Sequence, residues 1–499
     1  MESIFVSTRK IISKTQVILD CKFSIDSDNE VEKILAVNSV PVILTKNCLD
    51  NKITYSGKLS TSLLYETKNG RKIEVINVSD FNETLIADVS SGENVNIECK
   101  IIDITTPSIK TNEVKVACII EILPIILVEK EISCNITAEN VITKTNELIL
   151  TNFVQSINET FEFAEKIKIQ DSLNQILKID TNPSITKCQC KNGFITVDLD
   201  VFVCISYLDE FDNVKFYQEL FSFSQEFQAE DSIEEDNILL NILPLSHLSK
   251  TVVSQENNYN LISYSLTLQC FGEIFHQSVY NNIVDAYSTT DLISYKKQEI
   301  SGLSTLNNVF FTNSFTGKVN LLNENDNVLG FVNPNCEIIN SLYENEKTTI
   351  EGIISSTILY SKTSNNEENI ADSSTYSLIA EIPFTVTYQG EFAVSNIHCG
   401  IKNFNFHKDQ NSLEIEAKIN FWGNVEQKCD FENLTEVCLK SKKTLSPYAF
   451  EIFIAEEDIP LWDLCKKIGA KQEDILNQNK NISEPIKKGT KILHYNNLQ

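Results

Sequence analysis

One strand-like segment occurs three times in the sequence, and it constrains the fold more than any other feature. The copies begin at residues 53, 195 and 350, and each alternates apolar and polar side chains up to a tyrosine. Such alternation puts one face of a β-strand in a core and the other in water. A polar stretch and a phenylalanine follow, which predicts a hairpin in each copy; the pairs are Tyr65 and Phe81, Tyr207 and Phe223, and Tyr360 and Phe384. No catalytic group recurs in the segment, so the repeat indicates a fold and not a chemistry.

The repeat has the length of a domain. Ile34-Leu35 recurs as Ile176-Leu177 at an offset of 142 residues, and Val328-Leu329 matches the second copy at an offset of 152. A chain of 499 residues is too long for a single core. We therefore predict a mostly β protein with three repeated, sandwich-like domains and exposed boundaries between them. The expected domains span residues 1–148, 149–298 and 299–445.

The last fifty residues change from the period of a strand to that of a helix. Four apolar positions share one helical face of just over two turns: Leu461, Leu464, Cys465 and Ile468. Asp458 can cap this helix, Pro460 suits its first turn, and Gly469 stands just past its end. A second short helix is expected around 472–478, with strand-like pieces at 450–454 and 491–495. Residues 448–496 are therefore predicted to form a small α/β module in the order strand, helix, helix, strand.

Charge and composition exclude several classes of partner. The formal net charge is −27, whereas a nucleic-acid binder needs clustered Lys and Arg to displace counterions. The same charge disfavours unaided docking on an anionic membrane, and no run of 18 apolar residues predicts a membrane span. The start of the chain lacks the pattern of a secretory signal, and 14 cysteines then indicate free thiols in a reducing cytoplasm.

The sequence contains none of the catalytic motifs that we considered. The five histidines form no H-E-x-x-H, the cysteines never take C-x-x-C spacing, and no phosphate-binding P-loop is present. Cys188 and Cys190 lie on one strand face, an arrangement that we interpret as incidental and not as a metal site. Adjacent carboxylates are plentiful and are interpreted as a solvated face. We expect no enzyme activity, no cofactor and no metal.

The C-terminal residues resemble a LysM domain. The resemblance rests on Leu461-Trp462-Asp463-Leu464, on Asp474-Ile475-Leu476-Asn477-Gln478-Asn479, and on Lys491-Ile492-Leu493. Members of that family usually read Gly-Asp-Thr before Leu-Trp, where this chain has Asp458-Ile459-Pro460. The change removes a hydroxyl and a flexible glycine from the loop that helps form the family's glycan groove. It therefore favours a protein ligand over a sugar.

Trp462 has two interpretations. It can pack in the core of the module, or it can lie on the surface as an anchor for a partner. Its position is about 100° away from the apolar stripe of its own helix, given 3.6 residues per turn. We therefore predict partial exposure, because exposed tryptophans often anchor protein interfaces.

The whole chain resembles SPOCS-domain spore coat morphogenesis proteins of the SipL type, found in endospore-forming clostridia. The matching landmarks are Gly57 and Leu64-Tyr65, Gly352 and Leu359-Tyr360, and Ile382-Pro383-Phe384. The middle copy departs from the pattern with Leu199 in place of the glycine and Leu220 to Phe223 in place of Pro-Phe. The resemblance implies a non-enzymatic scaffold in the mother-cell cytoplasm, at the forespore surface. Its implied partner is the ATPase that forms the basement layer of the spore coat.

Two functions remain open from the sequence, and a third lacks support. The first is an assembly scaffold whose module binds a protein through rim residues of the LysM-like groove: Asp458, Ile459, Trp462, Asn479, Ile482 and Ile486. The second is a wall- or cortex-associated protein whose module binds the N-acetylglucosamine glycan of peptidoglycan. The third is a peptidoglycan hydrolase, for which no catalytic constellation is recognisable. The missing export signal and the lost Gly-Asp-Thr loop favour the first.

Overall fold

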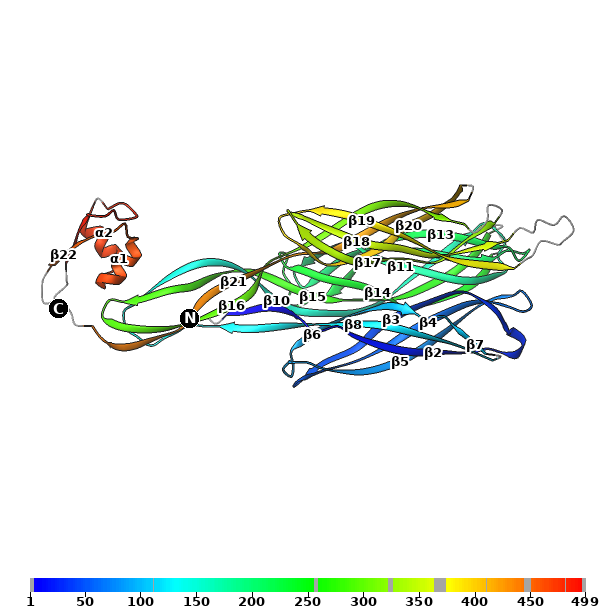
Figure 1. The fold of residues 1–499 in the computed structure, drawn as a ribbon, viewed down its shortest axis with the longest axis horizontal. Coiled ribbons are helices and arrows are strands. Elements are labelled where there is room, and N and C mark those ends of the chain that lie inside the picture. The colour runs from blue at the N-terminus through cyan, green and yellow to red at the C-terminus, as the bar shows by residue number, and fades with distance from the viewer. Residues whose placement is uncertain are drawn as a thin grey trace.

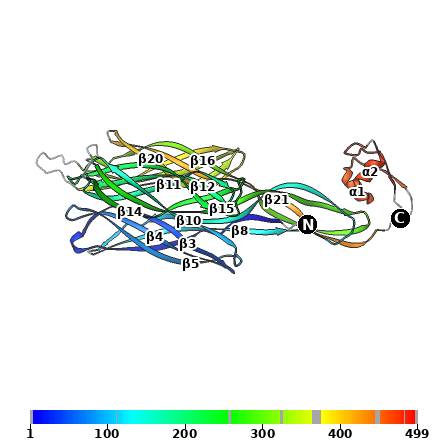
Figure 2. The ribbon, with the colours of Figure 1, turned by 180° about the vertical axis from the view of Figure 1, so that it is seen from behind.

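The computed structural model describes residues 4–110, 112–254, 259–321, 326–362, 374–409, 411–443, 450–480 and 482–495. Most of these residues lie in β-strands, as predicted, and the helices α1 (Leu461–Ile468) and α2 (Gln472–Gln478) lie near the C-terminus. The molecule is elongated (Figure 1). A wide body narrows into a stalk, and the C-terminal module lies beside the tip of that stalk in both views (Figure 2).

The strands fall into three successive sets. Set 1 contains β1 (Ile4–Ile11), β2 (Thr15–Ser24), β3 (Val31–Leu49), β4 (Lys52–Thr67), β5 (Lys72–Ile86), β6 (Asn94–Ile104), β7 (Ser108–Lys110) and β8 (Glu113–Ile132), with a 3-10 turn at Ser27–Asn29. Set 2 contains β10 (Val141–Ile169), β11 (Gln175–Lys191), β12 (Phe194–Leu208), β13 (Val214–Gln228), β14 (Asn237–Ser254) and β15 (Tyr259–Ser288). Set 3 contains β16 (Asp291–Asn320), β17 (Asn327–Glu344), β18 (Lys347–Ser361), β19 (Thr375–Gln389), β20 (Val394–Asp409) and β21 (Ser412–Lys442). The short β9 (Asn135–Ile136) pairs in parallel with β21.

Each set has the same order of pairing. One sheet is an antiparallel meander: β3-β4-β5, β11-β12-β13 or β17-β18-β19. The other sheet has the closing strand in the middle: β2-β8-β6, β10-β15-β14 or β16-β21-β20. The predicted hairpins are confirmed as β4–β5, β12–β13 and β18–β19, although the connection at 363–373 lies outside the described residues.

The two sheets of a set pack face to face around apolar side chains. In set 1, Leu59 and Leu63 of β4 pack in one cluster with Val116 and Ile120 of β8. Every second residue is buried over the first ten residues of each of these strands, as the alternation predicts. The tyrosines that end the repeated segment are all buried, with exposed fractions of 2% for Tyr65 and Tyr207 and 4% for Tyr360.

The first strand of each meander has a β-bulge at the same place. The pairing register shifts between Ile34 and Ala36, between Ile176 and Lys178, and between Val328 and Gly330. A bulge leaves one extra residue without a cross-strand partner. Those residues are Leu35, Leu177 and Leu329, which share one apolar cluster between the three sets. The recurring Ile/Val-Leu pair of the sequence thus marks the place where the sets meet.

Long strands cross the predicted domain boundaries. The boundary after residue 148 falls within β10 and the one after 298 falls within β16. Both strands pair along nearly their whole length, β10 with β15 and β16 with β21, and their outer halves form the stalk. The chain passes between sets at residues 133–140 and 289–290.

The C-terminal module has the predicted order of elements: β22 (Phe450–Ile454), α1, α2 and β23 (Lys491–Tyr495). Leu461, Leu464 and Cys465 are buried, and Gly469 ends α1 in the left-handed conformation with φ of 76°. The predicted cap is wrong, because Pro460 occupies the N-cap position and Asp458 bonds elsewhere. Among the described residues no helix has the length and apolar character needed to cross a membrane.

Candidate partner-binding site

The six predicted rim residues occupy three environments in the module. Asp458 is exposed, Ile459, Asn479 and Ile482 are half-buried, and Ile486 and Trp462 are buried. Ile459 and Ile486 are held together by two backbone hydrogen bonds, each 2.9 Å long. Ile486, with an exposed fraction of 1%, belongs to the core of the module and not to a rim.

The carboxylate of Asp458 closes a loop within the module. Its Oδ2 accepts a hydrogen bond from Lys487 Nζ at 2.8 Å, and its Oδ1 accepts one from the backbone N–H of Lys488 at 2.9 Å. The bonds from these two residues lower the pKa of Asp458 below its usual range. Both carboxylate oxygens are therefore already engaged on the module's own chain.

Asn479 is likewise occupied within the module. Its Nδ2 donates to the carbonyls of Ile475 at 2.9 Å and Leu493 at 2.7 Å, and its Oδ1 accepts from Leu493 N–H at 2.8 Å. These bonds tie the end of α2 to β23. The side chain acts as a brace between two elements of the module.

Trp462 is covered by the stalk. Its exposed fraction is 7%, so the predicted partial exposure is wrong in the intact chain. The indole Nε1–H donates to Asp285 Oδ2 at 2.8 Å, and the ring meets Tyr287 edge-on with centroids 4.9 Å apart. Nζ of Lys144, on β10, lies over the indole ring, 5.9 Å from its centroid. All three contacts come from the stalk strands β10 and β15.

Sequence reasoning missed these stalk residues. Asp285 and Tyr287 are about 175 residues away from Trp462 in the chain, and the local pattern of β15 reads only as the end of a long strand. A partial signal does exist on the module, since Lys466 follows Trp462 by four residues and therefore shares its helical face.

The β22–β23 pair carries an exposed apolar surface that was not predicted from the sequence. Phe450, Ile452 and Ile454 alternate along β22 with exposed fractions of 56%, 58% and 52%. Tyr495 of β23 is paired with Phe450 and is 51% exposed. Alternate residues of a strand share one face, so Phe450, Ile452 and Ile454 form an apolar row.

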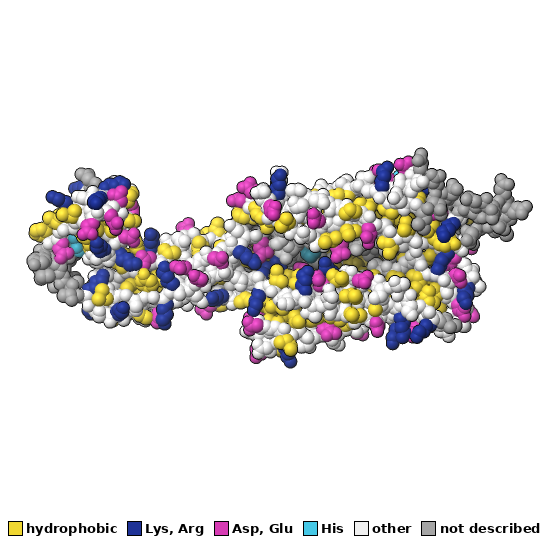
Figure 3. Space-filling model, in the orientation of Figure 1, with side chains coloured by type: hydrophobic (Ala, Val, Ile, Leu, Met, Phe, Trp, Pro, Cys, Tyr) yellow, Lys and Arg dark blue, Asp and Glu magenta, His cyan; other side chains and the backbone are white. Residues whose placement is uncertain are grey.

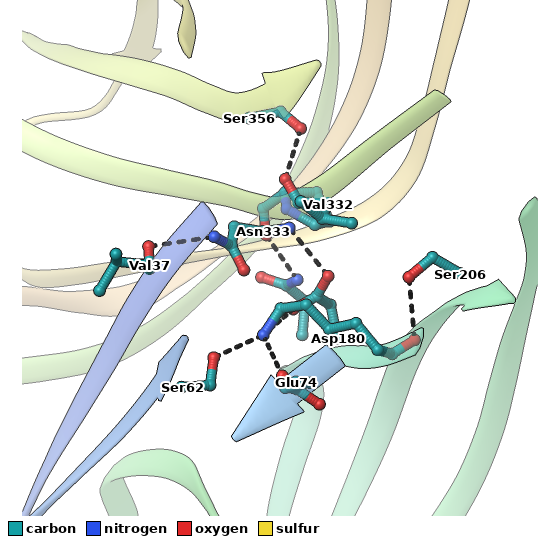
Figure 4. Close-up of polar contacts among 11 residues, drawn as sticks. Val37, Ser62, Glu74, Asp180, Ser206, Val332, Asn333 and Ser356 are labelled. Atoms are coloured by element: carbon teal, nitrogen blue, oxygen red, sulfur yellow. Dashed lines mark hydrogen bonds and ion pairs between the residues drawn. The ribbon is translucent and has the colours of Figure 1, made fainter. Parts of the chain in front are cut away.

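The three strand sets meet at a buried charged junction (Figure 4). Lys178 of set 2 donates to Ser62 Oγ at 2.6 Å and to Glu74 Oε1 at 2.8 Å, both in set 1. Asp180, next to Lys178 on the strand face, accepts the backbone N–H of Asn333 in set 3 at 2.8 Å. Burial alone lowers the pKa of Lys178, but Asp180 and Glu74 outweigh burial and the pKa is raised.

A cavity of about 1260 Å³ opens between the sets. It is lined by β3 and β6, by β11 and β14, and by β17 and β20, each of which pairs with a single neighbour in the described part of the chain. Four of the charged side chains at the cavity are paired, Lys14 with Glu121 at 2.9 Å and Lys100 with Glu337 at 3.4 Å. The lining therefore carries side chains of both charges.

The remaining candidate sites are thiols. All 14 cysteines are free, and burial raises the pKa of Cys190 to about 12 and that of Cys188 further. Within the ranges that the structure describes, no group of three or more His, Cys, Asp or Glu side chains is placed to hold a metal ion. Figure 3 shows acidic and basic side chains mixed over the stalk and the module.

A scan against protein-family models gave no match, and neither curated proteins nor solved structures gave a significant similarity to this chain.

Proposed function

We propose that this protein is a non-enzymatic scaffold of spore coat assembly, and that its C-terminal LysM-like module binds a protein partner. The three strand sets are then three copies of a SPOCS-type domain. The partner is the ATPase of the coat basement layer, and the complex forms in the mother-cell cytoplasm at the forespore surface. The Leu-Trp landmark of the module and the three copies of the strand segment support this assignment.

The main support for the proposal is that the polar side chains of the predicted rim are already hydrogen-bonded within the module. Asp458 and Asn479 use their side-chain oxygens and nitrogen on bonds within the module. Sugar recognition requires donors and acceptors that converge on hydroxyl groups, and these two side chains are committed elsewhere. Ile459 and Ile482 offer apolar contact instead, which suits burial against a protein, and Trp462 can add to that contact only when the stalk no longer covers it.

The shape of the molecule is compatible with an adaptor. The module lies at one end, beside the tip of the stalk, and the body lies at the other (Figure 1). Two partners could therefore be held by one chain without contact between them.

Capture of the purified ATPase by full-length protein tests the proposal. Wild-type protein should bind it, and Trp462→Glu should abolish capture because a carboxylate would be desolvated in the contact. Phe450→Glu adds the same charge to the exposed apolar row of β22 and is the matched control. Circular dichroism should show that both variants keep the β-rich fold.

Three outcomes separate the alternatives. Loss of capture in Phe450→Glu alone would move the contact to the β22–β23 face. Failure of the wild-type protein to bind the ATPase would refute this partner. Tight binding of chitin oligomers or purified peptidoglycan by the wild-type protein, with no capture of the ATPase, would favour the glycan-binding function.

A further inference from the structure

The face of α1 that carries Trp462 is matched by residues of the stalk tip. Trp462 and Lys466 are four residues apart on α1 and share a helical face, while Asp285 and Tyr287 are two apart on β15 and share a strand face. The two faces meet in the structure. The contact between α1 and β15 is therefore made by two side chains of the helix and two of the strand.

Asp285 is the centre of this contact. Its Oδ2 accepts from the Trp462 indole at 2.8 Å, and its Oδ1 accepts from Lys466 Nζ at 2.5 Å. The backbone N–H of Ala286 adds a third bond at 2.9 Å. Burial alone raises the pKa of Asp285, but the bonds from Lys466 and Trp462 outweigh burial and lower it, so the carboxylate stays ionised at neutral pH.

Tyr287 completes the contact on the apolar side. Its hydroxyl donates to the carbonyl of Ala470 at 2.8 Å, and its exposed fraction is 3%. Ile142 of β10 packs in the same cluster, which also contains Trp462 and the core of the module. Lys443, just past the end of β21, donates to the carbonyl of Ser288 at 2.5 Å.

We propose that the stalk tip competes with the partner for the Trp462 face, so that the module binds its partner only after it leaves the stalk. This inference rests on the proposed function of the module. The single chain then has a closed state, in which Asp285 and Tyr287 cover Trp462, and an open state, in which Trp462 is available.

The covalent link gives the stalk an advantage over the partner. Residues 444–449 join the stalk to the module, and a short tether gives an effective concentration of the order of millimolar. A partner that binds only the open state has its apparent affinity reduced by the fraction of molecules that are open. If about a tenth of the molecules are open, the apparent affinity is about tenfold weaker than that of the open state.

The test uses the full-length chain with Asp285→Ala and the milder Asp285→Asn, which keeps an acceptor for the indole but loses the charge that Lys466 contacts. Glu299→Gln is the matched control, because it removes an acidic charge from an exposed position on the stalk strand β16. Acrylamide quenching of tryptophan fluorescence measures the opening directly. The chain has two tryptophans, and Trp422 is buried in the body with an exposed fraction of 4%, so added quenching reports Trp462.

We expect quenching to increase in the order wild type, Asp285→Asn, Asp285→Ala, with Glu299→Gln equal to wild type. Capture of the purified ATPase should tighten about tenfold in Asp285→Ala if a tenth of wild-type molecules are open. Adding Trp462→Ala to Asp285→Ala should abolish the gain. Circular dichroism should confirm that all variants keep the wild-type fold.

The experiment distinguishes a failure of this inference from a failure of the proposed function. Unchanged quenching in the folded Asp285→Ala protein would show that Asp285 does not hold the module, which overturns the inference and leaves the proposed function standing. Increased quenching with unchanged or weaker capture would show that the stalk does not compete with the partner. Absence of capture by every variant would refute the proposed function, and the inference with it.

Discussion

Two glycines of the repeated segment have a steric role. Gly57 lies opposite Phe81 in the pairing of β4 with β5. A Cβ at Gly57 would lie 2.4 Å from Cζ of Phe81 and 2.3 Å from the carbonyl oxygen of Val42. The phenylalanine ring therefore lies over the glycine of the neighbouring strand. Gly352 repeats the arrangement in set 3.

Gly57→Ala should lower the free energy of unfolding by about 1 to 3 kcal/mol, because an added methyl would overpack this site. Phe81→Leu should not fully rescue the variant, since the carbonyl of Val42 remains too close. Ser60→Ala, on the same strand, should stay within about 0.5 kcal/mol of wild type. Chemical denaturation provides the measurement, and equal stability of Gly57→Ala and wild type would contradict the steric role.

The middle copy shows why the glycine is not obligatory. Leu199 stands at the equivalent position of β12, opposite Phe223. The ring of Phe223 instead stacks on Phe163 of β10, with centroids 4.8 Å apart. The departure from the other two copies is thus accompanied by a different placement of the aromatic ring.

Trp462 shows the limit of prediction at this scale. Helical periodicity correctly places it off the apolar stripe of α1, and the buried positions Leu461, Leu464 and Cys465 follow the predicted stripe. The side chain is nevertheless covered, by residues from a distant part of the chain. Local periodicity carries no information about such a contact.

At the scale of elements, β12 differs from its counterparts in being buried on both faces over most of its length. Val201, Val203 and Ile205 point into the core of set 2, whereas Phe202 and Cys204 join the core of set 3. The nearly continuous apolar run of this strand, which interrupts the alternation of the segment, reflects its position between two sets.

Phe202→Ala should destabilise the protein by about 3 to 5 kcal/mol, the usual cost of truncating a buried phenylalanine. Phe202 is 2% exposed, whereas Phe211, in the turn after β12, is 76% exposed and provides the control Phe211→Ala. Thermal unfolding should show a lower midpoint for the first variant alone. Similar midpoints for both variants would mean that the contact between β12 and set 3 contributes little.

Strand positions were predictable where alternation is clear, as in the three hairpins and in the βααβ order of the module. The lengths of β10 and β16 were not predictable. Both faces of these strands carry polar residues in the stalk, so their sequence shows no clear alternation of apolar and polar side chains. The bulges at Leu35, Leu177 and Leu329 were also not predicted as bulges. The repeated Ile/Val-Leu pair can occur in a regular strand as well as in a bulged one, so it does not by itself predict a bulge.

At the scale of the whole molecule, the arrangement of the sets depends on side chains that the sequence does not distinguish. Lys178 reads as a solvent-facing lysine in an alternating strand, yet its side chain is 4% exposed and bonds to set 1. Asp180 extends the contact to Asn333 of set 3. Such a junction needs the three-dimensional structure, because its partners lie about 100 to 150 residues away from one another.

Lys178→Met should cost about 3 to 5 kcal/mol, because it leaves the buried Asp180 and the half-buried Glu74 without their cation. Adding Glu74→Gln should recover part of the loss by removing one of those charges. Lys187→Met, at an exposed position of the same strand, is the matched control. Urea denaturation followed by fluorescence tests this, and a Lys178→Met protein as stable as the control would rule out a role of the ion pair in holding the sets together.

The long ladder of the stalk also determines how the chain carries force. β21 runs outward along β16 and ends at Lys442, paired with Asp291, immediately before the segment that leads to the module. Tension applied to the module along the stalk pulls β21 lengthwise against β16. Their backbone hydrogen bonds are then loaded together in shear and not opened one at a time as in peeling. The stalk therefore acts as a tether of nearly fixed length between the C-terminal end of β21 and the body, whereas a flexible linker of similar size would extend under the same load.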